Sequence, residues 1–476
     1  MTDFLAALRD RMPGLFIRTE ADDIDRACTD WRKRYHTSAL AVLEPRDTTQ
    51  VQDIIRLCSE HAVAITTQGG NTGLVGGAVP VAEGLASGRP HVVLKTGRIR
   101  EKLMLDENNL TLTASVGYTL YEIQEFAQAH GFLFPLSLAS EGTCTLGGNL
   151  ASNAGGVAVL RYGNTRELCL GLEYVNAQGQ LCGDLRGLRK NNTGYDLRHL
   201  LIGSEGTLGV ITTACMKIFP APKSRCVAWL NVDSIQVAVD ALGFIQGRMF
   251  GELSSYEWMN SHSIDLVQHH FPARAPGFNG RGDHVLVEFT SLADESGLRE
   301  QVMTTLEALL EEVAGVSNIA VAQNGREMDT FWALRENISE AQAKEGLNVK
   351  HDVACAVSQL PLFHDLALQE IAEHGIDVLP VLFGHLGDGN LHFNLSARKG
   401  TDSAAFLSQH QALLNSLVHE SILKCGGTVS AEHGIGQLKA ELLREITTGS
   451  NYATFQAIKQ ALDPQNLLNP GKLVLM

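Results

Sequence analysis

The stretch QGGNTGLVGG, residues 68–77, decides the fold. Half of its ten residues are glycine, and it comes just after a short apolar run, residues 62–65, that is typical of a buried strand. Glycine lets the main chain approach a bound group closely, and successive backbone amides in a turn form a concave site for an anion. The stretch therefore predicts a strand that opens into an anion-binding loop.

Two further glycine-rich stretches lie within the next 140 residues. One runs from Gly142 through Gly147 and Gly148 to Gly155 and Gly156, and the other is GSEGTLG, residues 203–209. The polar residues between these glycines are Asn71, Thr72, Asn149, Ser152 and Asn153. A single loop of this kind is more often an ordinary turn, whereas three favour a bound dinucleotide. Neither GxxxxGK[ST] nor a GxGxxG between a strand and a helix is present, so neither a P-loop nor a nicotinamide-binding Rossmann site is indicated.

The composition around these loops is that of an acidic globular protein. Its 476 residues predict two or three domains, and a formal net charge of −15 disfavours binding to nucleic acid. Nine scattered cysteines without a CxxC pair argue against a zinc ribbon or an iron–sulfur cluster and fit a reducing compartment. There is no signal-peptide core, and no apolar stretch approaches the roughly 20 residues that span a bilayer. The sequence predicts a soluble, cytoplasmic protein.

The spacing of the apolar residues predicts an α+β fold in three parts. Residues 1–222 alternate helical and strand patterns, with a helix at 48–60, and the FPAP at 219–222 marks a boundary. In residues 223–425, strand-like runs at 226–232, 284–289, 349–357 and 378–383 alternate with helices at 234–246, 295–313 and 329–344. Asp233 is the expected N-cap of the first of these helices. Residues 426–476 form a C-terminal segment.

Two histidines, His385 and His392, lie on either side of a predicted hairpin turn at Asp388-Gly389. With a two-residue turn, paired residue numbers sum to 777, so His385 lies opposite His392 with Cβ atoms about 5 Å apart. Asn394 shares their face, and Pro380 would confine its strand to a sheet edge or a bulge. A lone pair of histidines is more often a solvated surface feature, but this geometry suits a divalent ion.

A predicted carboxylate site lies on the helix at 329–344. Arg335 and Ser339 stand at i and i+4 on one face, and Lys350 opens the next strand. Arginine binds a carboxylate through a planar fork, lysine adds a point charge and serine adds a hydroxyl donor. The common alternative is a solvated helical face with an i,i+4 polar pair.

The three glycine-rich stretches, together with GHLGDGN (residues 384–390) and EHGIG (residues 432–436), resemble the vanillyl-alcohol-oxidase-type, FAD-linked flavoproteins over about residues 38–475. This resemblance implies a PCMH-type FAD-binding domain in residues 1–222 and a substrate domain with an antiparallel sheet in 223–425. It also implies that residues 426–476 pack back near the flavin and the metal. Gln68 stands where covalent relatives can carry histidine, and the surroundings of Cys144 do not match a cysteinyl link, so noncovalent FAD is expected.

The resemblance also implies roles for individual residues. FAD is expected at Gly69, Gly70, Asn71, Thr72, Gly73, Leu74, Gly147, Gly148, Asn149, Ser152, Asn153, Gly155, Gly156, Glu205, Gly206, Gly209 and Asn469. His385, His392 and Glu432 are the expected metal ligands, with zinc first and manganese or another divalent ion second. Two histidines and one carboxylate leave coordination positions open, as in catalytic sites. Arg335, Ser339, Lys350 and Asn394 are expected to bind substrate, and His433 is the expected general base.

These residues predict the oxidation of a D-2-hydroxy acid, in which His433 takes the hydroxyl proton and the flavin takes the hydride from C2. D-2-hydroxyglutarate, giving 2-oxoglutarate, is the expected substrate, with D-lactate, D-malate or glycolate as alternatives. Related enzymes carry threonine where Ser339 stands, which leaves selectivity open. The resemblance implies an electron-transferring flavoprotein or a quinone-linked acceptor. The rival hypotheses are a metal-dependent hydrolase without flavin and a noncatalytic flavin-binding subunit. A homodimer is one of the oligomeric states left open.

Overall fold

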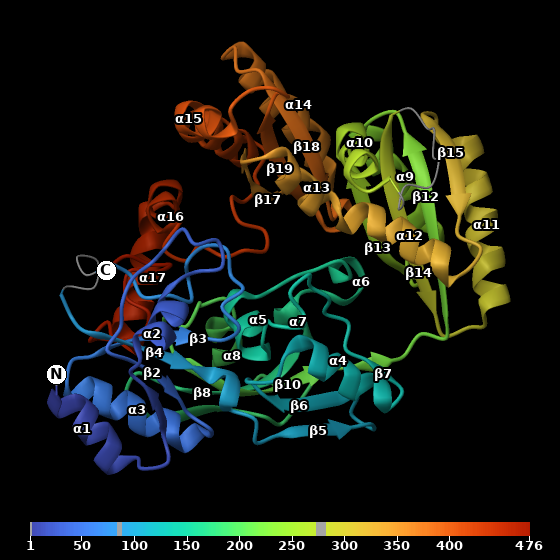
Figure 1. Ribbon diagram of the computed structural model, residues 1–476. Helices are drawn as coiled ribbons and strands as arrows, with labels where there is room; N and C mark the ends of the chain where they lie inside the picture. Colours follow the sequence, from blue (N-terminus) through green and yellow to red (C-terminus); the bar gives the residue numbers. More distant parts are fainter. Residues whose placement is uncertain (1, 83–87, 273–281) are drawn as a thin grey trace. The chain divides into compact units, whose positions relative to one another are not determined.

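The computed structural model describes residues 2–82, 88–272 and 282–476, which form two compact units (Figure 1). The first unit comprises Met1–Gly155, Gly163–Pro220 and Glu432–Met476, and the second comprises Gly156–Tyr162 and Ala221–Ala431. The main segment of the second unit therefore begins directly after Pro220, and the C-terminal residues from Glu432 belong to the first unit. The sequence does not reveal that Gly156–Tyr162 belongs to the second unit.

The first sheet of the first unit has the strand order β1-β2-β4-β3. Its strands are β1 (Phe16–Arg18), β2 (Ala41–Glu44), β3 (Ala64–Gln68) and β4 (His91–Lys95), with helices α1 (Thr2–Arg11), α2 (Ala21–Cys28) and α3 (Thr48–Glu60). Strands β2, β4 and β3 are parallel. The C-terminal tail adds to β3, because Ile65 donates its amide to Leu467 and accepts the amide of Asn469. Strand β3 thus delivers the QGGNTGLVGG loop beside the end of the chain.

The second sheet of the first unit is antiparallel, with the order β5-β6-β10-β8-β9. Its strands are β5 (Leu103–Asp106), β6 (Thr111–Ser115), β8 (Cys169–Val175), β9 (Leu181–Asp184) and β10 (Val210–Lys217), and β7 (Phe132–Leu133) pairs with β11 (Phe219–Pro220). The helices of this part are α4 (Leu120–Ala129), α5 (Leu146–Ser152), α7 (Thr165–Leu168), α8 (Leu197–Leu201), α16 (Ala440–Ile446) and α17 (Gly449–Leu462). Helix α5 begins inside the second glycine-rich stretch, with Thr145 as its N-cap.

The second unit is built on one antiparallel sheet with the order β15-β12-β14-β13-β18-β19-β16, to which β17 adds beside β19. Its strands are β12 (Ser224–Val232), β13 (Leu253–Met259), β14 (Asp283–Ser291), β15 (Val316–Val321), β16 (Asn348–Val349), β17 (Asp352–Ala354), β18 (Val378–Gly384) and β19 (Asn390–Ala397). Its helices are α6 (Val159–Tyr162), α9 (Ile235–Met249), α10 (Ser261–His270), α11 (Glu295–Glu312), α12 (Gly325–Glu336), α13 (Ile338–Glu345), α14 (Leu360–Glu373) and α15 (Ser403–Lys424).

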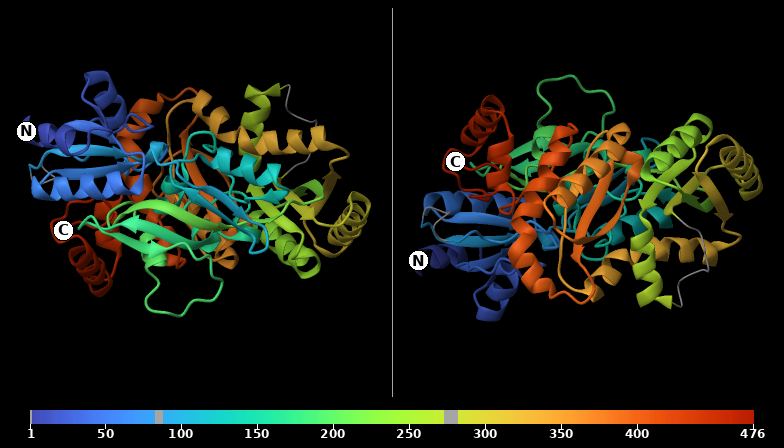
Figure 2. Two further views of the ribbon diagram at one scale, coloured as in Figure 1. Left: turned by 90° about the horizontal axis from the view of Figure 1, so that it is seen from below. Right: turned by 90° about the horizontal axis from the view of Figure 1, so that it is seen from above.

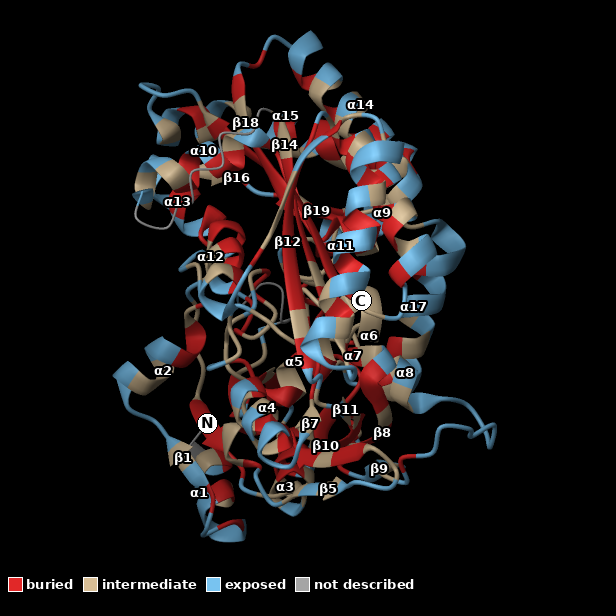
Figure 3. Ribbon diagram, turned by 90° about the vertical axis from the view of Figure 1, so that its right-hand side faces the viewer, coloured by how far each residue is buried: buried red, intermediate tan, exposed pale blue. Residues whose placement is uncertain are grey.

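The core of the second unit lies on the faces of this sheet. Figure 3 shows β12 buried along most of its length, and Trp229 on β12 packs with Phe331 and Trp332 of α12 in one cluster of buried residues. Helices α14 and α15, orange in Figure 2, pack against each other. Strand β13, with the sequence LSSYEWM, is buried at every position, and Glu257 is its only charged residue.

Most predicted elements of regular structure are present, with shifts at their ends. The helix at 48–60 is confirmed, with Asp47 as its N-cap. The N-cap of α9 is Ser234 and not Asp233, because the Ser234 hydroxyl accepts the amide of Val237. The predicted strand at 349–357 is wrong: two short strands, β16 and β17, are separated by Lys350 and His351. The thiols of all nine cysteines are free.

The predicted single helix at 329–344 is also wrong, because it is divided into α12 and α13. Asn337 separates the two and donates its side-chain amide to the carbonyl of Ala333. The main-chain hydrogen bonds from Asn337 to Ala333 and from Ala341 to Asn337 are nevertheless present. Arg335 and Ser339 therefore lie in successive helices but remain about one turn apart in a helical path.

The predicted hairpin register is wrong by two residues. Strands β18 and β19 pair Phe383 with His392, so paired numbers sum to 775, and the 3-10 helix η5 (Leu386–Asp388) occupies the turn. An even shift keeps every side chain on its predicted face, so His385 still lies near His392. Strand β18 is also not an edge strand, but its pairing to β13 is confined to Gly384 and Phe383, so Pro380 has a strand partner on one side only.

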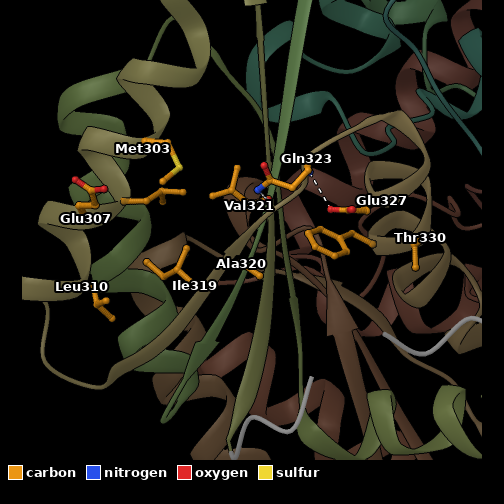
Figure 4. Close-up of a pocket in the computed structure, with 11 residues that line it drawn as sticks. Met303, Glu307, Leu310, Ile319, Ala320, Val321, Gln323, Glu327 and Thr330 are labelled. Carbon is orange, nitrogen blue, oxygen red and sulfur yellow. Dashed lines mark hydrogen bonds between the residues drawn. The ribbon is translucent and has the colours of Figure 1, made fainter. Parts of the chain in front are cut away.

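A hollow beside β15 lies outside the predicted sites. Figure 4 shows Met303 and Leu310 of α11 facing Ile319 and Val321 of β15, with Glu307 and Glu327 at its rim. None of the predicted site residues lines it. No helix in the described part of the chain is long and apolar enough to cross a membrane.

Candidate active site

A cavity in the first unit brings the three glycine-rich stretches together. The predicted cofactor residues that line it are Gly69, Gly70, Asn71, Thr72, Gly73, Gly147, Gly148, Asn149, Ser152, Glu205, Gly206, Gly209 and Asn469. Leu74, Asn153 and Gly155 do not line this cavity, and Gly156 belongs to the second unit. Lining residues that the sequence did not single out include Thr67, Thr96, Thr145 and Ile211. Thr67, Thr145 and Ile211 lie in or beside a glycine-rich stretch, whereas Thr96 follows β4 and has no such signal.

Close backbone approach explains two of these glycines. A Cβ on Gly70 would lie 2.1 Å from the carbonyl oxygen of Thr143, and one on Gly69 would lie 2.5 Å from the hydroxyl of Thr145. Neither distance is possible for a real side chain. The first glycine-rich loop therefore packs directly on the segment that begins α5 because it lacks side chains.

Four predicted cofactor residues that are not glycine adopt a left-handed backbone. They are Asn71 (φ 54°), Asn153 (φ 51°), Glu205 (φ 51°) and Asn469 (φ 43°). Such conformations cost energy for residues with a Cβ, least for asparagine, and cluster where a ligand is bound. The strain at Glu205 is offset by its contacts, because its carboxylate accepts the amides of Ile435 and Gly436, each at 2.7 Å.

Glu205 also connects the loop to the end of the chain. Asn469 donates its side-chain amide to the carbonyl of Glu205 at 2.6 Å. Burial raises the pKa of Glu205, while the two amides and Lys472 act in the opposite direction. Lys472 is itself buried, with 1% of its surface exposed, and burial lowers its pKa to about 7 although Glu205 raises it. GSEGTLG, EHGIG and the C-terminal tail thus meet at one carboxylate.

The cavity fits FAD on an observation of its own. Thr67 Oγ1, Asn71 Oδ1 and Asn149 Nδ2 are buried and have no hydrogen-bond partner among the described residues, and all three residues line the cavity. Buried polar side chains are partnered in the large majority of cases. A ligand with a pyrophosphate and polar ring edges would satisfy them. Gln68 is occupied otherwise, since its amide donates to the carbonyls of Ala27 and Ala78.

The second unit holds the histidine pair. His385 follows β18 and His392 lies in β19, with ring centroids 5.7 Å apart and ring nitrogens within 4.8 Å of each other. The carboxylate of Asp352 on β17 lies 3.9 Å from Nδ1 of His392 and accepts the side-chain amide of Asn390 at 3.0 Å. Two imidazoles at this separation fit one divalent ion between them.

A carboxylate that the sequence did not single out lies behind this pair. Glu257 of β13 is completely buried, and its two oxygens accept hydrogen bonds from Nδ1 of His385 at 2.6 Å and Nε of Arg335 at 2.8 Å. Burial raises the pKa of Glu257, but the charges and hydrogen bonds of His385 and Arg335 outweigh it and lower the pKa to about 2. Its only signal in the sequence is that it is the one charged residue in β13.

The predicted substrate residues lie in different surroundings. Arg335 is 8% exposed, with its guanidinium 4.7 Å from the centre of the Phe383 ring. Asn394 is buried and donates its amide to Gln342 at 3.0 Å. Ser339 and Lys350 are exposed. All four lie in the second unit, as the two histidines do.

Glu432 and His433 follow the last residue of the second unit. The amide of Ala431 bonds to the carbonyl of Asp352, and Asp352 pairs with His392 across β17 and β19. The chain then passes into the first unit, where His433 lines the cavity of the glycine-rich loops. Ala431, which bonds to β17 beside His392, is thus only two residues along the chain from His433, which lines the cofactor cavity.

Comparison with known proteins gives the class. Residues 39–183 match the FAD binding domain family, and residues 221–473, more than half of the chain, match the family of FAD linked oxidases, C-terminal domain. The chain therefore belongs to the FAD-linked oxidase family and is an FAD-dependent oxidoreductase.

Curated relatives and solved structures agree with this family. D-2-hydroxyglutarate dehydrogenase of Xanthomonas citri pv. viticola is 35% identical over 99% of this chain and 97% of its own length. Mitochondrial D-2-hydroxyglutarate dehydrogenase of Arabidopsis thaliana is 35% identical over 96% of this chain and 78% of its own. Substrate-bound p-cresol methylhydroxylase aligns with a TM-score of 0.74 at 16% identity, over 100% of this chain and 96% of its own, which shows the shared fold.

Proposed function

We propose that this protein oxidises D-2-hydroxyglutarate to 2-oxoglutarate, using noncovalent FAD and a divalent metal ion, with zinc as the first candidate. The observation that carries the proposal is that one buried carboxylate, Glu257, accepts hydrogen bonds from both His385 and Arg335. The residue proposed as a metal ligand, His385, and the residue proposed to bind the substrate carboxylate, Arg335, thus share one hydrogen-bond acceptor. The names of the relatives support the same substrate.

The metal would be held by His385, His392 and Glu432. Two imidazoles and one carboxylate are the donor set of catalytic zinc sites, which keep positions open for substrate. A bound divalent ion lowers the pKa of a coordinated hydroxyl, and bound FAD accepts a hydride. The remaining steps, which are proton acceptance and substrate binding, are proposed for side chains of this protein.

His433 is proposed to accept the proton of the substrate hydroxyl. Imidazole is the side chain that most often accepts a proton as a general base in enzymes. His433 lines the cavity that fits FAD, and only one residue separates it from Ala431, which pairs beside His392. Glu432 and His433 can hold different roles because adjacent side chains point in different directions.

Arg335, Ser339 and Lys350 are proposed to bind the distal carboxylate of the substrate, with Asn394 supporting the site. Arg335 has its Nε held by Glu257, which leaves the two Nη groups as a fork for a carboxylate. The hollow beside β15 is unsuited to a dicarboxylate, because Glu307 and Glu327 line it and would repel an anion.

The reduced cofactor requires an external acceptor, because no haem or iron–sulfur motif is present in the sequence. We propose an electron-transferring flavoprotein or a quinone-linked acceptor. The nine free thiols support a reducing compartment, for which we propose the cytoplasm.

The test is a panel of D- and L-2-hydroxy acids with a dye acceptor, run with and without a chelator on purified protein. We expect a visible flavin spectrum that D-2-hydroxyglutarate bleaches without oxygen. Activity should be highest with this substrate, and it should be lost with chelator and restored by zinc or manganese. A colourless protein that takes up no FAD would overturn the proposal, as would D-lactate as the preferred substrate.

A further inference from the structure

Glu257 is an unusual residue for its position. It lies in the interior of the sheet with no exposed surface, between Tyr256 and Trp258 of β13, which are equally buried. A carboxylate in such surroundings is costly unless each oxygen has a strong donor. A merely structural strand would carry an apolar residue here, so the contacts of Glu257 point to a role.

One contact orients a predicted metal ligand. Nδ1 of His385 lies 2.6 Å from Oε1 of Glu257, and His385 is buried, with 7% of its surface exposed. A carboxylate acceptor places the ring proton on Nδ1, so the imidazole carries its lone pair on Nε2. Carboxylate partners of this kind fix the ring of a metal-ligating histidine and make it a stronger ligand.

The other contact orients a predicted substrate ligand. Nε of Arg335 lies 2.8 Å from Oε2 of Glu257, and the guanidinium lies over the ring of Phe383. Phe383 pairs with His392, and its ring centre lies 4.9 Å from that of the imidazole. The guanidinium plane is therefore held on one edge and one face, which pre-organises its remaining donors.

We propose that Glu257 is a positioning residue that sets the affinity of the metal through His385 and the affinity of the substrate carboxylate through Arg335. This inference rests on the proposed function and deepens it. Because both groups bond to one carboxylate, a change at Glu257 should weaken the two affinities together, although Glu257 itself touches neither ligand.

The test compares Glu257→Gln with Glu257→Asp in the FAD-loaded protein. Glutamine keeps the shape but cannot accept from both donors with equal strength, and aspartate keeps the charge but is one methylene shorter. Zinc affinity is measured by competition with a chromophoric chelator, which does not depend on turnover. We expect zinc binding to weaken about 10- to 100-fold in Glu257→Gln and less in Glu257→Asp.

Steady-state kinetics give the second readout. In Glu257→Gln, we expect KM for D-2-hydroxyglutarate to rise roughly 10-fold or more, because a charge-assisted contact is loosened, with a smaller rise for D-lactate. The control is Glu288→Gln on the neighbouring strand β14, whose carboxylate accepts from Arg225 at 2.6 Å and from Trp332 at 2.8 Å, and from no histidine among the described residues. Its zinc affinity and KM ratio should match wild type.

Two failures can be told apart. If wild type binds no metal and turns over equally well without one, the proposed function fails. If wild type requires zinc but Glu257→Gln keeps wild-type zinc affinity and the wild-type KM ratio, only the positioning role is overturned. If Glu257→Gln does not fold, as judged by its far-UV spectrum, Glu257→Asp decides by the same two measurements.

Discussion

At the scale of single residues, the site depends on a few buried charges. Glu257 and Lys472 are buried and Glu205 is half-buried, and their partners decide whether they remain ionised. Glu257 has two cationic or hydrogen-bonding partners, whereas Nζ of Lys472 has no hydrogen-bond partner among the described residues. These differences lead to separate predictions.

Lys472 should make stability depend on pH. Its pKa in the folded protein is about 7 against an ordinary 10.5, so between these pH values the unfolded state binds more protons. Stability from this group therefore rises with pH from about 7 upward, by at most about 1.4 kcal/mol per pH unit. Urea unfolding at pH 7, 8 and 9 should show a smaller rise in Lys472→Met than in wild type. Lys399→Met, at an exposed lysine, should keep the wild-type dependence.

Lys350 and Ser339 should decide the choice of substrate. Lys350→Ala and Ser339→Ala remove contacts proposed for the distal carboxylate, which D-lactate lacks. A charge-assisted contact is worth about 1.5–3 kcal/mol, so kcat/KM for D-2-hydroxyglutarate should fall roughly 10- to 150-fold in Lys350→Ala and less in Ser339→Ala. Activity with D-lactate should change little. An equal fall for both substrates would exclude this assignment.

At the scale of elements, the structure differs from the sequence-based predictions mainly at helix ends and in strand pairing. The spacing of apolar residues locates α3, α9 and α11 well, because each helix buries one stripe against its sheet. It misplaces the cap of α9 by one residue, since Asp233 and Ser234 are both good caps and the choice depends on where the helix starts. It misses the break at Asn337, which separates α12 from α13 and whose side-chain amide donates to the carbonyl of Ala333.

The cap of α9 can be tested directly. Ser234→Ala removes the side chain that accepts the amide of Val237 and should lower the free energy of unfolding by about 1 kcal/mol. Asp233→Ala is the matched control and should change it by less than about half of that. Denaturant melts of both variants would decide, and a larger loss in Asp233→Ala would restore the cap expected from the sequence.

At the scale of the whole molecule, the cavity of the glycine-rich loops and the histidine pair belong to different units, and Glu432 belongs to the first unit. The residues lining the glycine-rich cavity lie in the first unit, whereas His385 and His392 lie in the second. The two ligands should therefore bind with separate determinants. The chain leaves the second unit at Ala431 and re-enters the first unit at Glu432, directly before His433.

His385→Ala and His392→Ala should accordingly lose the metal and the activity while keeping the flavin. Removing one of two imidazoles from a site with open positions should lower the affinity for the metal ion by several orders of magnitude, because few ligands remain. Metal analysis, the flavin absorbance and turnover are measured on the same preparations. His410→Ala, at a histidine on α15 outside the site, is the control and should retain all three. Full turnover in a metal-free variant would remove the ion from the mechanism.

The sequence by itself determined the class of fold, the loops that form the cofactor cavity and the face of the hairpin that carries the two histidines. These are local properties: glycine where the backbone must approach a neighbour, and a period of two or 3.6 residues where one face is buried. The tertiary structure alone decided the 775 register, the addition of the C-terminal tail to β3, and the meeting of Glu257 with His385 and Arg335. Glu257 is 78 residues from Arg335 and 128 from His385 in the sequence, and only the pairing of β13 with β18 and the packing of α12 bring the three together. A contact between such distant residues leaves no local pattern, because it is chosen by the packing of the folded chain.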